Sequence, residues 1–266
     1  MKISFITLFP EIIQSYISTG LLARAQTQSL LEFEILDIRD AVTKNYKSAD
    51  DTVYGGSDGM LIQYDPLVQT LNKVKRGQKA KVIYLSPQGQ CLNQNLIQDL
   101  KNETHLILVS GRYAGVDQRF IKEYVDLEIS IGDYVLSGGE LPSLVLVESL
   151  SRQISGVLGH NDAANNDSFA QGLLEAPQFT KPSDINGMKV PAVLTSGDHR
   201  KIELWKNQMS VLVTLKKRQD LIQAKVKDIN WKQIEIFYRS LSADDKTLLQ
   251  INNLDLQIES YKNGNL

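Results

Sequence analysis

Four short runs rich in valine, isoleucine and leucine recur in roughly the first 155 residues, and amphipathic stretches separate them. The runs are Ile3–Phe9, Lys81–Ser86, Leu106–Gly111 and Leu127–Gly132. They lack the alternation of polar and apolar residues that a half-exposed strand shows, as expected when helices cover both faces of a parallel sheet. This pattern constrains the fold most strongly, and it predicts an α/β domain built on a parallel sheet.

Turn-forming residues follow three of these runs, at Ser86–Gly89, Gly111–Gly115 and Gly132–Gly139. Ligands of open α/β sheets bind outside the carboxyl ends of the strands, so three such loops together predict a pocket. The alternative, that any α/β protein needs turns at these places, stays open on spacing alone.

The stretch from Glu140 to Ile154 is mostly apolar and carries Pro142 where the first turn of a helix would lie. Proline is tolerated in that turn because the amide it lacks would have no helical partner there. A helix so apolar is buried, and we expect it to pack in a core or against another subunit.

The remaining chain divides at a polar stretch of small residues, GHNDAANNDSFAQG, which we predict to be a flexible linker. Beyond Pro191 there is no proline, and beyond Gly197 the only glycine is Gly264. Recurring apolar positions from Ile202 onward predict helices. The predicted organisation is a domain of residues 1–158, a linker of residues 159–172 and a helical domain of residues 173–266.

Composition adds limits on the class of protein. Cys91 is the single cysteine, which excludes a disulfide scaffold, and no apolar run approaches the roughly 20 residues that span a bilayer. We therefore expect a cytoplasmic protein without a membrane contact. The net charge of −2 argues against nucleic acid when taken over the whole chain.

The charge is unevenly distributed. Residues 198–232 hold nine basic and four acidic side chains, a net charge of +5, which leaves −7 for the rest of the chain. A basic helical segment is compatible with phosphate contacts. A solvated helix face is the alternative and the usual meaning of such a run.

The motifs of the chain argue against several chemistries. Residues 55–59 match G-x-S-x-G, but polar residues rather than a buried strand precede them, so we predict a glycine loop that closes over substrate or packs against backbone, not a nucleophile at Ser57. The phosphate-loop motif G-x-x-x-x-G-K-[ST] and the dinucleotide-binding motif G-x-G-x-x-G do not occur, which argues against a nucleotide triphosphatase and a standard dinucleotide site. The three histidines are far apart, and we predict no metal site formed by them. Arg152 and Asp167 are candidate catalytic residues, because a carboxylate on a mobile segment could become ordered as a base when substrate binds. Taken singly, each is also compatible with an ordinary surface charge, and their spacing alone does not make them a pair.

Several segments together resemble the bacterial tRNA (guanine-N1)-methyltransferases, the TrmD family of the SPOUT class. They are Lys81–Gly89, Leu106–Tyr113, the run SIGDYVLSGGELP from Ser130 to Pro142, and Gly156–Gly159. The similarity covers essentially the whole chain and includes Ser4–Pro10, Tyr54–Gly56 and Pro191–Gly197. The long run is highly specific, and so many motifs in one order are not expected by chance.

The resemblance implies an α/β domain with a deep trefoil knot and a homodimer with a shared active site. It implies transfer of a methyl group from S-adenosyl-L-methionine to N1 of guanosine 37 of tRNA, 3′ of the anticodon and preceded by another G. The implied donor-binding residues are Tyr84, Leu85, Ser86, Pro87, Gly111, Arg112, Tyr113, Ile131, Gly132, Asp133, Tyr134, Val135, Leu136, Gly138, Gly139 and Pro142.

The resemblance also implies roles in the reaction. Asp167 matches the base that removes the N1 proton, and Arg152 matches the residue that stabilises the charge developing on O6. The helical domain is the implied tRNA-binding part, with Lys216, Lys217, Arg218 and His199 as contacts to tRNA.

The chain departs from the family at Ala114, where the usual motif GRYEG has a glutamate and this sequence reads GRYAG. Alanine supplies no carboxylate beside the methyl donor, so we expect the same reaction with weaker donor binding, and a Mg²⁺ requirement stays open. Two alternatives remain. One is an RNA-binding homologue with weakened catalysis, which Ala114 favours and Arg152 and Asp167 oppose; the other is a related knotted methyltransferase that acts on another RNA.

Overall fold

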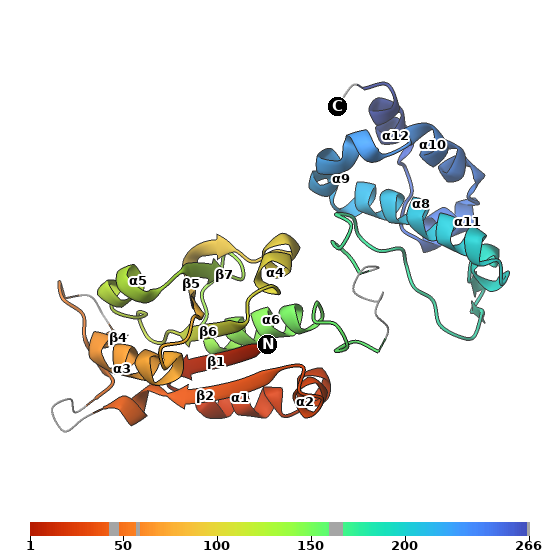
Figure 1. The fold of residues 1–266 in the computed structure, drawn as a ribbon. Coiled ribbons are helices and arrows are strands. Elements are labelled where there is room, and N and C mark those ends of the chain that lie inside the picture. Colours follow the sequence, from red (N-terminus) through yellow and green to blue (C-terminus); the bar gives the residue numbers. More distant parts are fainter. Residues whose placement is uncertain (43–47, 57–58, 160–166, 265–266) are drawn as a thin grey trace. The chain divides into compact units, whose positions relative to one another are not determined.

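The computed structural model describes residues 1–42, 48–56, 59–159 and 167–264 (Figure 1). The chain forms two compact units, residues 1–161 and residues 162–266. Residues 167–172, from the stretch predicted as a linker, form hydrogen-bonded turns within the second unit: the amide of Gly172 donates to the carbonyl of Phe169, at 3.0 Å.

A parallel sheet of five strands forms the centre of the first unit, in the order β2-β1-β6-β5-β7. The strands are β1 (Lys2–Thr7), β2 (Glu32–Asp37), β5 (Lys81–Cys91), β6 (His105–Ser110) and β7 (Leu127–Ser130). This confirms the predicted parallel α/β fold. All six residues of the central strand β6 are buried, which explains why its sequence lacks alternation.

Helices cover both faces of this sheet. They are α1 (Pro10–Ile17), α2 (Gly20–Thr27), α3 (Tyr64–Lys75), α4 (Gln94–Leu100), α5 (Gln118–Tyr124) and α6 (Glu140–Ser151), with a 3-10 turn η1 at Ile38–Ala41. Leu106 and Leu108 of β6 pack with α1, α2, α4 and α6, whereas Ile107 and Val109 pack with α3 and α5. Two hydrophobic cores therefore lie back to back, one on each face of the sheet.

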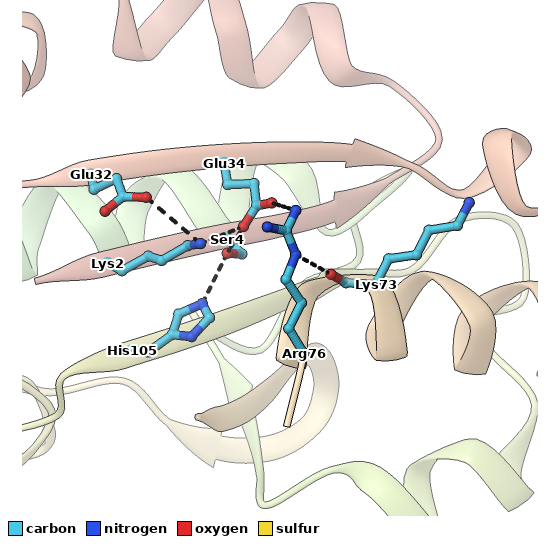
Figure 2. A network of polar contacts seen from close by, with 7 residues as sticks. All are labelled: Lys2, Ser4, Glu32, Glu34, Lys73, Arg76 and His105. Atoms are coloured by element: carbon cyan, nitrogen blue, oxygen red, sulfur yellow. Dashed lines mark hydrogen bonds and ion pairs between the residues drawn. The ribbon is translucent and has the colours of Figure 1, made fainter. Parts of the chain in front are cut away.

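A polar network joins β1, β2 and β6 at one end of the sheet, on the face that α3 covers (Figure 2). Lys2 Nζ lies 2.7 Å from Glu34 Oε2, and the Ser4 hydroxyl donates to the same oxygen at 3.1 Å. Ser4 Oγ is also 2.9 Å from His105 Nε2. Because Ser4 gives its only proton to Glu34, His105 must donate from Nε2, which leaves Nδ1 as a buried nitrogen without a hydrogen-bond partner in the described structure.

The second unit is helical, as the sequence predicts. Its helices are α8 (His199–Lys217), α9 (Gln219–Lys225), α10 (Trp231–Ser240), α11 (Ala243–Leu248) and α12 (Asp255–Lys262), with a short hairpin of β8 (Asp184–Ile185) and β9 (Met188–Lys189) and 3-10 turns η2 (Ala192–Thr195) and η3 (Val226–Asp228). Trp231 stacks on Tyr261 at 4.7 Å between ring centroids. Within the described residues of both units, no helix is long and apolar enough to cross a membrane.

Candidate active site

A cavity of about 410 Å³ lies at the carboxyl ends of β5, β6 and β7 in the first unit. Its walls come from the three loops that the sequence singled out, and every predicted donor-binding residue except Asp133 lines it. The side chain of Asp133 is exposed instead. The cavity is within the size range of small-molecule sites, roughly 300–1,000 Å³.

The first loop differs from the prediction that β5 ends at Ser86. The strand runs to Cys91, and both Leu85 and Gln90 pair with Ile129 of β7, so the residues between them bulge out of the ladder. Gly89 permits this path, because a Cβ there would lie 2.4 Å from the backbone carbon of Glu128. The cavity wall at Ser86–Gln88 is therefore held at both ends by the sheet.

The second and third loops are joined by Arg112 and Glu140. Arg112 Nε lies 2.9 Å from Glu140 Oε2, and Glu140, at the start of α6, is only 1% exposed. The hydroxyl of Thr7 donates to Glu140 Oε1 at 2.7 Å, and the Arg112 guanidinium lies 4.3 Å from the centre of the Phe9 ring. A Cβ on Gly138 would lie 2.3 Å from Arg112 Nε, so this ion pair requires glycine at that position.

Tyr84 occupies the inner wall of the cavity. Its hydroxyl lies so close to the loop after β6 that a Cβ on Gly111 would approach it to 2.8 Å, and one on Gly115 to 3.0 Å. Burial raises the pKa of Tyr84, and the negative charge of Glu128 acts in the same direction. The phenol is therefore protonated at neutral pH and fills space beside the two glycines.

The described residues of the glycine-rich loop are exposed, and a Cβ on Gly55 or Gly56 would meet no atom within 4 Å, so these residues show neither closure over a substrate nor packing against backbone. An antiparallel pair of strands, β3 (Asp50–Thr52) and β4 (Met60–Ile62), carries this loop. The amide of Ala114 donates to the carbonyl of Met60 at 3.0 Å, and a Cβ on Gly59 would lie 3.8 Å from that of Ala114. Ser57, the residue considered as a nucleophile, lies outside the described residues.

The two candidate catalytic residues belong to different units. Arg152 follows α6 directly and is half-buried, whereas Asp167 is half-buried in the second unit. Asp167 lines a groove of about 990 Å³ that runs along α8 and that His199, Lys206 and Lys225 also line. The second unit thus brings Asp167 and His199 to one groove.

The predicted tRNA contacts are not one cluster. His199 is the first residue of α8, while Lys216 and Lys217 end the same helix. At about 1.5 Å per residue, roughly 26 Å of helix separate the two ends. Arg218 Nη2 lies 2.6 Å from Asp220 Oδ2, and the guanidinium carbon of Arg218 lies 5.8 Å from the centre of the Phe169 ring. Arg218 therefore contacts the turn that follows Asp167.

Sequence reasoning missed Glu128, which lines the donor cavity. It lies within β7, and its importance depends on the lateral pairing that places it opposite Tyr84 of β5. Such a pairing across the sheet leaves no local signal in the sequence.

The similarity to known proteins extends along most of the chain. A model of the tRNA (guanine-1)-methyltransferase TrmD family matches residues 1–224. Two similar proteins are each named tRNA (guanine-N(1)-)-methyltransferase. The one from Idiomarina loihiensis is 46% identical over 226 residues, which cover 84% of this chain and 90% of that protein. The one from Pseudomonas fluorescens SBW25 is 43% identical over 252 residues, which cover 94% of this chain and 95% of that protein. These matches confirm the resemblance noted from the motifs, and the chain belongs to the tRNA (guanine-1)-methyltransferase TrmD family.

Proposed function

We propose that this protein transfers a methyl group from S-adenosyl-L-methionine to N1 of guanosine 37 in tRNAs that carry a G before it. The observation that carries the proposal is the cavity at the ends of β5, β6 and β7, lined by the donor-binding residues that the family resemblance implies. The SPOUT knot is also part of the proposal and rests on that resemblance, and a cytoplasmic location is part of it and rests on the composition of the chain.

The cavity suits the proposed donor. Its volume accommodates an adenosine with an amino-acid tail. When bound, the donor supplies an electrophilic methyl group on a positively charged sulfur. The chain's task is then to hold the guanine in line and to remove its N1 proton.

We assign proton removal to Asp167 and charge stabilisation to Arg152. Guanine N1 is a poor nucleophile while it carries its proton, so the Asp167 carboxylate accepts that proton as the methyl group is attacked. Negative charge then grows on O6, where the Arg152 guanidinium stabilises the transition state more than the ground state. The base must leave its stack to reach these groups, which suits the single-stranded anticodon loop.

The proposed active form is a homodimer with a site completed by both subunits. Helix α6 supports this, because it exposes Leu141 (57%) and Val145 (43%) on a helix whose other apolar residues are buried. We further propose that Lys216, Lys217, Arg218 and His199 contact tRNA phosphates.

One observation favours a second function, an RNA-binding homologue with weakened catalysis: Ala114 supplies no carboxylate to the donor cavity. Action on another RNA by a related methyltransferase is the third possibility, which the extent of the family match opposes.

The decisive test is methyl transfer to purified tRNA transcripts that differ at only two positions. Position 37 is G or A, and the preceding nucleotide is G or another base. We expect transfer only to the transcript with both guanosines, and a rate at least ~100-fold lower for Asp167→Asn, since general base catalysis is typically worth that much. Asp244→Asn, at an exposed position of α11, is the matched control. Transfer to the A37 transcript, or full activity of Asp167→Asn, would refute the mechanism; RNA binding without any transfer would favour the second function.

A further inference from the structure

The charges that line the donor cavity are few. Among the described residues that form its walls, Arg112 is the one cation and Glu128 the one carboxylate. Arg112 already forms an ion pair, with its Nε 2.9 Å from Glu140 Oε2, and its guanidinium carbon lies 4.3 Å from the centre of the Phe9 ring. Glu128 is therefore the one formal charge of these walls that another charged side chain does not balance.

Glu128 is held in place by the sheet. It is the second residue of β7 and lies opposite Tyr84 in the parallel pairing with β5. Its side chain is half-buried, and within the described part of the chain it takes part in no ion pair and no hydrogen bond. Partial burial without a partner is unfavourable for a carboxylate, and a cation supplied by a ligand would relieve that cost.

Position 114 faces the same cavity from another wall. In the sheet order, β5 lies between β6 and β7, and Ala114 belongs to the loop that follows β6. Tyr84 connects the two walls: its backbone pairs with that of Glu128, and its hydroxyl lies beside Gly111 and Gly115. A ligand that fills this cavity would lie within reach of both walls.

We propose that Glu128 supplies the negative charge that binds the cationic methyl donor in this chain, in place of the carboxylate missing at Ala114. S-adenosyl-L-methionine carries a sulfonium and an ammonium against a single carboxylate, so its net charge is positive. A hydrogen bond or ion pair to a charged group is among the stronger polar interactions available in a partly dry site. The inference rests on the proposed function, since it presumes this donor.

The test is calorimetric titration of the full-length protein and of Glu128→Gln with two ligands. One is S-adenosyl-L-methionine; the other is methylthioadenosine, which keeps the adenosine but carries no charge. We expect Glu128→Gln to bind the first at least ~10-fold more weakly and the second unchanged, because a hydrogen bond to a charged group is worth about that factor. Asp99→Asn, at an exposed position of α4 outside the cavity, is the control and should bind both ligands like the unmodified protein.

A rescue variant separates charge from shape. Adding Ala114→Glu to Glu128→Gln should restore most of the lost affinity for S-adenosyl-L-methionine, because it returns one carboxylate to the same cavity. Equal weakening of both ligands by Glu128→Gln, or no weakening of either, would overturn the assignment while leaving methyl transfer by the unmodified protein intact. If the unmodified protein binds neither ligand and transfers no methyl group, the proposed function itself fails, and this inference with it.

Discussion

Arg112 Nε and Glu140 Oε2 lie 2.9 Å apart and connect the loop after β6 to the first turn of α6. The two groups form an ion pair rather than a well-aligned hydrogen bond, since neither atom has a hydrogen-bond partner in the described structure. Thr7 completes the site from β1. Three segments distant in the sequence are thus held at the edge of the donor cavity by one buried carboxylate.

Glu140→Gln should destabilise the first unit by about 3 kcal/mol, because removal of one partner leaves the other charge partly buried and unpaired. Hydrogen exchange of peptides from β1 and β6 is the suitable measurement, since both tryptophans lie in the second unit and report only on it. Glu103→Gln breaks the more exposed pair with Lys81 and should cost less than about 1 kcal/mol. Equal losses in the two variants would contradict a special role for Glu140.

Gly138→Ala should disturb the same ion pair from the other side. The added methyl group would lie 2.3 Å from Arg112 Nε and 2.5 Å from Glu140 Oε2, so one of these side chains must move. We expect lower affinity for S-adenosyl-L-methionine in calorimetry and a lower melting temperature. Gly159→Ala meets no atom within 4 Å and is the matched substitution; a loss as large in this variant would count against the steric explanation.

His105 should make the stability of the first unit depend on pH. Burial, together with the positive charge of Lys2, lowers the pKa of His105, so the folded protein binds a proton less readily than the unfolded chain. The contribution of His105 to the free energy of unfolding is therefore complete above the pKa of the unfolded chain, about 6.5, and it is lost as the pH falls below that value. His105→Gln should flatten this dependence between about pH 6.5 and 5, measured by hydrogen exchange of β6 peptides. Parallel pH profiles for the two proteins would refute the assignment.

The double variant that carries Lys216→Ala and Lys217→Ala should bind tRNA more weakly, and its binding should depend less on salt concentration. Each lost phosphate contact lowers the slope of log affinity against log salt by about 0.7 to 0.9. Lys79→Ala with Lys101→Ala is the control, because both residues precede strands and lie at the sheet end opposite the donor cavity. Filter binding at several salt concentrations tests this, and an unchanged slope for the α8 variant would place the tRNA elsewhere.

Runs of apolar residues located β1, β5, β6 and β7, because strands that helices cover on both faces are mostly apolar, as the buried residues of β1 and β6 are. The edge strand β2 escaped prediction, since Glu32 and Glu34 alternate with apolar residues in a half-buried strand. The segment Ser86–Gly89 reads as a turn and does leave the ladder, but only pairing with β7 shows that the strand resumes.

For the candidate site too, some features could be predicted from the sequence and others depend on tertiary structure. Loops at strand ends could be located along the sequence, and the motifs assigned them to a donor. The position of Glu128 opposite Tyr84 depends on which strands are neighbours, which no local pattern records. His199 and Lys216 share a run of charge in the sequence, yet the length of α8 separates them.

The bulge in β5 has a consequence for how this fold can diverge. Because Leu85 and Gln90 pair with the same residue, Ile129, residues Ser86–Gln88 lie outside the ladder and can change without altering any other pairing in the sheet, whereas Gly89 lies too close to the backbone of Glu128 to be replaced. Insertions there would reshape one wall of the cavity and leave the scaffold untouched. Ligand preference and fold stability can therefore change independently at this point, so this segment is where the cavity can be re-engineered at least risk to the rest of the protein.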